Sequence, residues 1–342
     1  MSESLFKPLS EFEEKDAEWL IDKLIPKKNI TIIAGDGGMG KTTLWADIVA
    51  SVSNGKRCVL DGQIVNRDPG LVLAFATEDS VREKLKRKMR LAGANENNIV
   101  MPDYGSDTSG ELQKYMFSTN ALTDVILHYA PVLVVFDPIQ AFVPTEWNMG
   151  ARNVMRRCLA PLKAIGEQIG TTFIIICHTN KRDGAYGRNR LADSGDIYDI
   201  ARSVLIVGEA SDGTRYIAHD KSNYDELQKT KLFSIHDPGI ISIVGESYKR
   251  DRDFVQEKYH WKKIATTKQD CKEWIRQELK TQRDFTMLSE DLKNKAVEAG
   301  YSKATFERAK KELGKKGTDE IRYFTPGGGN SWYTQLRPVM PD

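Results

Sequence analysis

Residues Gly35 to Thr42 follow the pattern G-x-x-x-x-G-K-[ST], in which a glycine-rich loop ends in a lysine and a hydroxyl residue. Glycines let the backbone curl until consecutive N–H groups point at one anion, and the positive end of the following helix faces the same point. The lysine can reach the terminal phosphates of a nucleotide, and the threonine hydroxyl can ligate Mg²⁺. We therefore predict a site for ATP and Mg²⁺ rather than a glycine-rich turn that binds nothing. The residues predicted to bind the nucleotide are Gly35, Asp36, Gly37, Gly38, Met39, Gly40, Lys41, Thr42 and Thr43.

Four strand-length apolar segments are expected to position this loop and the residues that act with it. They occupy residues 29–34, 71–76, 131–137 and 171–177, and helical patterns lie between them. Continuous apolar runs are typical of strands buried on both faces. Their alternation with helices predicts an α/β fold, with a mostly parallel, twisted sheet flanked by helices.

Polar residues follow three of these segments. Asp137 ends an apolar run in the pattern called Walker B, whose carboxylate holds the Mg²⁺ shell, so we predict Thr42 and Asp137 as metal ligands. Glu78 and His178 follow two of the other segments. Because ligands bind at the carboxyl ends of parallel strands, all these residues should meet the glycine-rich loop at one edge of the sheet.

Hydrolysis also needs a carboxylate that orients and activates a water molecule near the γ-phosphate. A glutamate directly after Asp137 could supply this carboxylate, but the residue there is Pro138. The base must therefore come from elsewhere, and Glu78 is the candidate. The alternative is that Glu78 only supports the start of the helix that Ser80 caps. His178 is predicted to sense the γ-phosphate or the lytic water; the alternative is an ordinary strand-end histidine.

Five motifs, taken in order, resemble those of the RecA-like ATPase superfamily, in particular the plasmid RepA-type hexameric replicative helicases and their phage and mobile-element relatives. The resemblance extends over residues 17–245 and implies a RecA-like core. One departure is Cys177-His178, where that family commonly has two histidines, so a preceding histidine has no role here. The motifs are Gly35–Thr43, Thr77–Ser80, Phe136–Ile139, Cys177–Lys181 and Gly195–Ser203.

The resemblance implies a ring in which ATP lies between subunits and the neighbouring subunit supplies a cation to the γ-phosphate. By family position Arg202 is that cation, and Lys221 is a second candidate. The family's tandem Lys-x-Arg pattern is absent, because this chain has Lys221-Ser222-Asn223 there. The alternative for both residues is an ordinary charge at a strand end.

The glycine-rich, basic segment at residues 181–190 corresponds, in such a ring, to a mobile loop that faces the central channel. Cations with one aromatic residue suit the backbone and bases of single-stranded DNA. A flexible surface loop without a ligand is the competing interpretation. The residues predicted to contact DNA there are Lys181, Arg182, Tyr186, Arg188 and Arg190.

The last 77 residues show three helical patterns followed by two short strands around a Pro-Gly-Gly-Gly turn, which resembles a winged helix. The last two of these helices, joined by a short glycine turn, form a helix-turn-helix. Its second helix carries Lys303, Arg308 and Lys311 and would enter the major groove of duplex DNA; docking of a protein is the alternative. The predicted domains are an N-terminal arm (1–26), a RecA-like ATPase core (27–245), a charged linker (246–265) and a winged-helix-like domain (266–342).

Composition narrows the choice of partners and compartment. The chain of 342 residues has a net charge of +2, but residues 261–342 hold 17 Lys and Arg against 12 Asp and Glu. This local excess favours an anionic partner for the C-terminal quarter. The four cysteines lack metal-type spacing, and neither a signal segment nor a membrane-length apolar run is present. We expect a cytoplasmic protein with reduced thiols.

These observations together favour an ATP-driven motor on DNA, a homo-hexameric replicative helicase or translocase of a plasmid, phage or mobile element. A replication initiator or a primase is an expected partner. Two alternatives stay open: a DNA-binding replication initiator or regulator whose ATP site only switches its assembly, and a recombination-mediator ATPase. The motifs report ATP chemistry and do not show what that chemistry moves.

Overall fold

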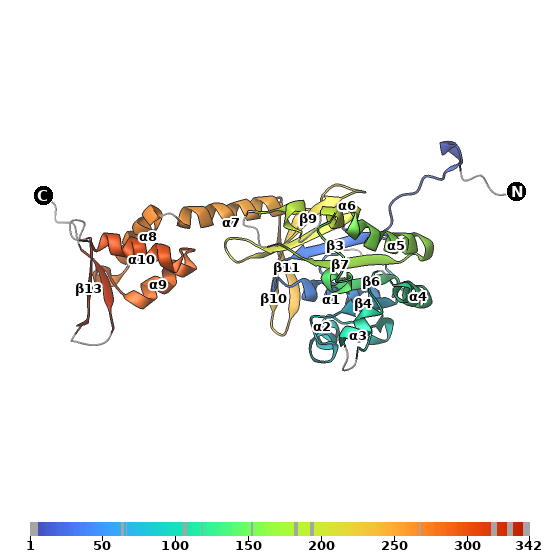
Figure 1. Cartoon of the computed structure of the whole chain (residues 1–342), viewed down its shortest axis with the longest axis horizontal. Helices are drawn as coiled ribbons and strands as arrows, with labels where there is room; N and C mark the ends of the chain where they lie inside the picture. The colour runs from blue at the N-terminus through green and yellow to red at the C-terminus, as the bar shows by residue number, and fades with distance from the viewer. Residues whose placement is uncertain are drawn as a thin grey trace. The chain divides into compact units, whose positions relative to one another are not determined.

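The computed structural model describes residues 6–62, 65, 67–104, 108–117, 119–151, 153–180, 184–191, 195–266, 268–315, 320–326 and 331–337 (Figure 1). The chain divides into two compact units, Met1–Phe254 and Val255–Asp342. The division falls inside helix α7 (Asp251–Thr266). Most of the segment 246–265, predicted to be a charged linker, is therefore helical, because its Lys, Arg and Glu residues favour a helix.

The first unit is built on one large mixed sheet, as the sequence predicts. Its order across the sheet is β11-β10-β9-β8-β3-β7-β6-β4-β5. The strands from β8 to β5 run parallel, and β9, β10 and β11 are added antiparallel to one another beyond β8. The strands are β3 (Ile30–Gly35), β4 (Val72–Ala76), β5 (Ile99–Val100), β6 (Leu133–Asp137), β7 (Thr172–His178), β8 (Ser203–Glu209), β9 (Arg215–Ser222), β10 (Thr230–His236) and β11 (Ile240–Ser247).

Helices cover both faces of this sheet (Figure 1). On one face α1 (Lys41–Asn54) and α2 (Lys86–Leu91) pack with residues such as Ile33, and on the other α4 (Asn120–Tyr129), α5 (Val154–Ile169) and α6 (Gly195–Ile200) pack with residues such as Ile32. Adjacent strand residues point to opposite faces, so a run such as 30–34 must be apolar throughout. Short helical segments also occur at Leu9–Glu11, Val81–Leu85, Glu96–Asn98, Thr108–Gln113, Ile139–Phe142 and Gly187–Arg190.

The N-terminal arm ends earlier than the sequence predicts. Residues from Phe6 to Phe12 are exposed, but the small hairpin of β1 (Trp19–Ile21) and β2 (Ile25–Pro26) packs on the core. Leu20, Ile21 and Ile25 are buried among residues of α1 and the sheet. Residues 19–26 therefore belong to the ATPase unit, since their apolar side chains complete one face of its core.

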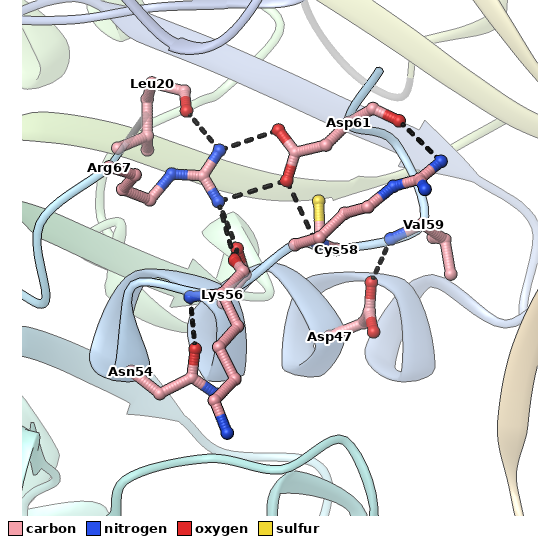
Figure 2. Close-up of polar contacts among 10 residues, drawn as sticks. Leu20, Asp47, Asn54, Lys56, Cys58, Val59, Asp61 and Arg67 are labelled. Carbon is pink, nitrogen blue, oxygen red and sulfur yellow. Dashed lines mark hydrogen bonds and ion pairs between the residues drawn. The ribbon is translucent and has the colours of Figure 1, made fainter. Parts of the chain in front are cut away.

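A buried arginine joins the N-terminal hairpin to the far end of α1. Figure 2 shows the guanidinium of Arg67 between the carbonyl of Leu20, at 2.6 Å, and the carboxylate of Asp61, at 2.7 Å. The same guanidinium donates to Ser51 Oγ on α1, and Asp61 also accepts a hydrogen bond of 2.8 Å from the Cys58 amide. The cluster fixes the loop after α1 against the hairpin, at the end of α1 away from the glycine-rich loop.

The second unit is small and has its own core. Helices α8 (Lys268–Lys280), α9 (Ser289–Glu298) and α10 (Lys303–Leu313) pack around Ile275, Leu292 and Phe306. Ser302 caps α10, because its Oγ accepts from the Thr305 amide at 3.1 Å. The expected hairpin is present as β13 (Ile321–Phe324) and β14 (Tyr333–Leu336). A third strand, β12 (Thr286–Leu288), completes an antiparallel sheet; it is too short for an alternating apolar pattern to reveal it in the sequence.

Among the helices that the structure describes, none has the length and apolar character that crossing a membrane requires.

Candidate nucleotide site

The glycine-rich loop connects β3 to α1, and two of its glycines are required by space and conformation. A Cβ on Gly35 would lie 2.5 Å from the carbonyl oxygen of Val207 on the adjacent strand. Gly40, which precedes α1, has φ +99°, and a Cβ there would lie 2.6 Å from the Ile235 side chain. Only glycine fits both positions, so the first and sixth residues of the motif shape the loop directly.

Lys41 is the first residue of α1, and its side chain is folded into the loop. Its Nζ donates to the carbonyl oxygens of Gly35, at 2.7 Å, and Asp36, at 2.9 Å, and lies 3.5 Å from His178 Nδ1. Lys41 is only 6% exposed, and burial lowers the pKa of its ammonium, while Asp137 and Glu78 act in the opposite direction. The buried cation thus lies where the motif predicts a phosphate partner.

The predicted meeting of strand ends is present. In the register of the sheet, Gly35 of β3 is level with His178 of β7, and Ala76 of β4 is level with Asp137 of β6. Glu78 follows β4 by two residues, and its Oε1 lies 2.9 Å from His178 Nε2. Because the Lys41 ammonium can only donate, Nδ1 is the acceptor and Nε2–H the donor in a neutral His178 ring. One imidazole therefore connects the loop lysine to the candidate base.

Asp137 is buried beside α1, with 5% of its surface exposed. Burial raises the pKa of its carboxyl group, and a 2.7 Å hydrogen bond from Trp45 Nε1 to Oδ2 opposes that rise. Sequence reasoning did not identify Trp45. The signal was present, since Trp45 lies four residues after Lys41 and so on the same side of α1.

The residues present fit a Mg²⁺ ion that nucleotide phosphates help to hold. Among the described residues there is no group of three or more His, Cys, Asp or Glu side chains able to hold a metal. Mg²⁺ needs no such cage, because it commonly binds one or two carboxylates, substrate phosphates and water. Thr42 at the start of α1 and the buried carboxylate of Asp137 supply one hydroxyl and one charge that a cation would compensate.

The side chain of Asp36 in the loop binds two other side chains, those of Thr179 and Arg190. The sequence did not predict that either residue contacts Asp36. Its Oδ1 accepts a hydrogen bond from Thr179 Oγ1 at the end of β7. Its Oδ2 lies 3.3 Å from Arg190 Nη2. Arg190 is 8% exposed, so its predicted contact with DNA needs correction: the guanidinium is buried among carboxylates and has no free face for a DNA phosphate.

Arg202 and Lys221, the two cations expected to reach the γ-phosphate of a neighbouring subunit, lie at the amino-terminal end of β8, away from the glycine-rich loop. The Arg202 amide donates to the carbonyl of Ile30, five residues before Gly35 and so roughly 16 Å from it along an extended strand. Lys221 pairs with Val204 on the adjacent strand, and its Nζ donates to the Tyr198 and Asp199 carbonyls at 2.9 and 3.0 Å. Within one chain, neither cation is near the glycine-rich loop.

Arg202 and Lys221 differ in the hydrogen-bond partners that their side chains have within the chain. Burial lowers the pKa of the Lys221 ammonium, whose bonds to the end of α6 leave it engaged within the chain. Arg202 Nε is buried and has no hydrogen-bond partner in the described part of the chain. Arg202 is also partly exposed and donates no side-chain hydrogen bond in the described residues, so it is the better candidate for contact with another molecule.

The predicted DNA-contacting residues have varied surroundings. Lys181 and Arg182 lie outside the described residues. Tyr186 is 36% exposed beneath the guanidinium of Arg252, and Arg188 forms an exposed ion pair of 2.6 Å with Asp199. In the second unit, Lys303, Arg308 and Lys311 are exposed on α10.

Most of the first unit matches a known protein family. The family model described as an AAA domain (AAA_25) matches residues 5–184. DNA repair protein RadA of Bacillus subtilis is 23% identical over 225 residues, 65% of this chain and 42% of RadA. RadA of Mycobacterium tuberculosis (strain H37Rv) is 23% identical over 222 residues, 64% of this chain and 40% of RadA. The chain thus spans about two fifths of the length of these curated relatives.

Among solved structures, a KaiC-like protein from the hyperthermophilic archaeon Pyrococcus horikoshii OT3 is similar, with a TM-score of 0.48 and 18% sequence identity. The match covers 68% of this chain and 99% of that one.

Proposed function

The chain belongs to the AAA_25 family of AAA domains and has a RecA-like P-loop ATPase core, and from this premise we propose that it is an ATP-driven motor on DNA. The motor would be a homo-hexameric helicase or translocase that serves the replication of a plasmid, phage or mobile element. A replication initiator or a primase would be its partner.

In the proposed reaction each residue at the carboxyl ends of the strands around the glycine-rich loop has a separate role. Lys41 binds the β- and γ-phosphates, and Thr42 and Asp137 hold the Mg²⁺ shell. Mg²⁺, when bound, neutralises charge that develops on the phosphate oxygens. Glu78 orients and activates the attacking water, and His178, 2.9 Å from it, keeps the carboxylate at the end of β4.

The observation that supports an assembly is the separation of the two halves of the site. Arg202, whose Nε lacks a partner in the described residues, lies at the edge of the sheet opposite the P-loop. A cation there can reach a γ-phosphate only in another copy of the chain. Because the donor and acceptor surfaces are different, the contact is head-to-tail, and such contacts form a ring when the rotation between neighbouring chains closes.

The DNA partner rests on two exposed basic regions. Tyr186 and Arg188, with Lys181 and Arg182 of the same segment, would contact single-stranded DNA in the ring channel. Lys303, Arg308 and Lys311 on α10 would contact duplex DNA.

Similarity to DNA repair protein RadA favours a second candidate, an ATPase that acts in DNA repair or recombination. The exposed basic face of α10 equally suits an initiator that binds duplex DNA and uses ATP only to switch its assembly. The motor differs from the switch in one measurable respect: its hydrolysis should depend on single-stranded DNA.

Steady-state ATP hydrolysis with and without single-stranded DNA tests the motor. We expect several-fold stimulation in the wild type, retained when Lys303, Arg308 and Lys311 are all changed to Ala, and loss of hydrolysis by about 100-fold or more in Glu78→Gln. Stimulation that disappears with the α10 variant would favour the initiator. These substitutions are preferable to truncation after Gly245, which would remove the buried Asp251 and Phe254 from the ATPase unit.

Mixing two inactive variants tests the shared site. In a ring of Glu78→Gln and Arg202→Ala chains, a site with Glu78 from one chain and Arg202 from its neighbour is intact. Random mixing in equal amounts should restore about a quarter of the sites. Mixtures that stay as inactive as either variant alone would place Arg202 outside the catalytic site.

A further inference from the structure

One buried guanidinium bridges the P-loop and the beginning of α7. Arg190 Nη2 lies 3.3 Å from Asp36 Oδ2, and Nη1 binds Asp251 Oδ1 and lies 3.2 Å from Tyr216 OH. Asp36 and Asp251 are 154 and 61 residues away from Arg190 in the chain. The guanidinium thus connects three segments that only the fold brings together.

The carboxylate of Asp251 also binds residues of two other segments. Asp251 is fully buried, and its carboxylate accepts hydrogen bonds from Tyr216 OH at 2.9 Å and the Gly187 amide at 3.1 Å. The Tyr216 ring stacks on Phe254 of α7 with ring centres 4.2 Å apart. The first turn of α7 and residues 187–190 are therefore held by the same carboxylate.

Charge keeps this arrangement together. Burial alone lowers the pKa of the Arg190 guanidinium, but Asp251, Tyr216 and Asp36 more than offset that effect and the pKa is raised. Arginine is suited to the position because its planar fork can donate to two carboxylates at once, whereas a lysine ammonium is a single point.

The other end of the bridge responds to whatever occupies the P-loop. An ammonium has three N–H donors, and Lys41 directs its three toward the Gly35 carbonyl, the Asp36 carbonyl and His178. A phosphate that binds Lys41 must displace at least one of these partners. Loss of a backbone contact at residues 35–36 would release the segment that carries the Asp36 carboxylate.

We propose that Arg190 is a positioning residue that transmits the occupancy of the P-loop, through Asp36, to residues 184–191 and to the first turn of α7. The inference rests on the proposed ATP binding. Through Arg190, the position of the basic segment that begins at Lys181 would depend on bound nucleotide. The position of the first turn of α7 would depend on it as well.

Hydrogen exchange on the full chain, with and without ATPγS and Mg²⁺, tests this relay. In the wild type the nucleotide should change exchange at residues 35–42, and also at 184–191 and 251–254, by about fivefold or more at sites that are coupled. The Gly187 amide, which donates to Asp251, is the most direct reporter.

Arg190→Lys should retain the response at 35–42 and lose it at 184–191 and 251–254. Arg67→Lys is the matched control, because Arg67 is an equally buried arginine paired with an aspartate but has no contact with the P-loop in the described residues. It should respond like the wild type. If Arg190→Lys does not fold, Asp36→Asn leaves the Arg190–Asp251 pair in place and should show the same loss.

Three results would overturn the relay: a wild-type response confined to 35–42, an Arg190→Lys response equal to the wild type, or a loss shared by Arg67→Lys. Absence of any response at 35–42 in the wild type is distinct from these. It would overturn the proposed ATP binding, and the relay with it.

Discussion

Two buried arginines in the ATPase unit, Arg67 and Arg190, have similar chemistry and different positions. Their side chains are 9% and 10% exposed, and each pairs with a buried aspartate. Arg67 binds Asp61, six residues earlier, and ties the loop after α1 to the N-terminal hairpin (Figure 2). Arg190 binds Asp251 and also Asp36, a residue of the P-loop.

The difference lies in the second partner. The additional acceptors of Arg67 are backbone carbonyls and a serine hydroxyl, which belong to elements that nothing in the site displaces. The additional acceptors of Arg190 are the Tyr216 hydroxyl and the half-exposed carboxylate of Asp36, beside the lysine that we propose binds the phosphates. Both pairs should therefore contribute to stability, and only the second should affect nucleotide chemistry.

The largest expected effect is on stability, and it should be similar for both arginines. Arg190→Ala and Arg67→Ala each leave a buried carboxylate without its cation, which typically costs about 3–5 kcal/mol in the free energy of unfolding. Urea unfolding of each variant measures the loss. A loss under about 1 kcal/mol for either variant would show that its pair contributes little beyond the hydrogen bonds that remain.

Asp47, on α1 beside the Arg67 cluster, should make stability depend on pH. Burial raises the pKa of its carboxyl group from 3.8 to about 6, opposed by a hydrogen bond from the Val59 amide. The folded chain therefore binds this proton more tightly than the unfolded chain, and stability falls as pH rises from about 4 to about 6.

Asp47→Asn removes this loss. The variant should match the wild type at pH 4 and be more stable at pH 8, by at most about 3 kcal/mol. Thermal unfolding at both pH values measures the difference. An equal gain at both values would mean that the carboxyl group does not titrate in this range.

Asp36→Asn separates the two arginines by activity. The substitution removes one charge from the Arg190 bridge and leaves the Asp251 pair in place, so the free energy of unfolding should change by about 1 kcal/mol or less. The KM for ATP should rise by about tenfold, equivalent to 1.4 kcal/mol of binding, because the P-loop loses a restraint on its shape. Asp61→Asn in the Arg67 cluster is the control, and its KM should stay within about twofold of the wild type.

The smallest effect concerns a cap in the second unit, far in sequence from both clusters. Ser302→Ala removes the hydroxyl that accepts from the Thr305 amide, which should cost about 1 kcal/mol. Thermal unfolding should register the loss while the KM for ATP stays unchanged. A changed KM would show that local stability in this unit alone alters ATP binding.

The sequence by itself determined the P-loop, the Walker B aspartate and their meeting with Glu78 and His178. The reason is that the apolar pattern is local, and general rules of chain connection then give the parallel arrangement. A continuous apolar run predicts a buried parallel strand, and parallel strands place their carboxyl ends together. The glycine pattern similarly predicts where only glycine fits, which the close approach of Val207 at Gly35 and the positive φ of Gly40 confirm.

Only the tertiary structure decided the role of Arg190. In the sequence, Arg188 and Arg190 are equivalent cations of one basic segment. The fold exposes the first beside Asp199 and buries the second between Asp36 and Asp251. Burial and partner depend on residues that are distant in the chain, and no local pattern encodes them. The same reason explains why the contact of Thr179 with Asp36 emerged only from the folded chain, whereas the helical spacing of Trp45 from Lys41 was readable in the sequence.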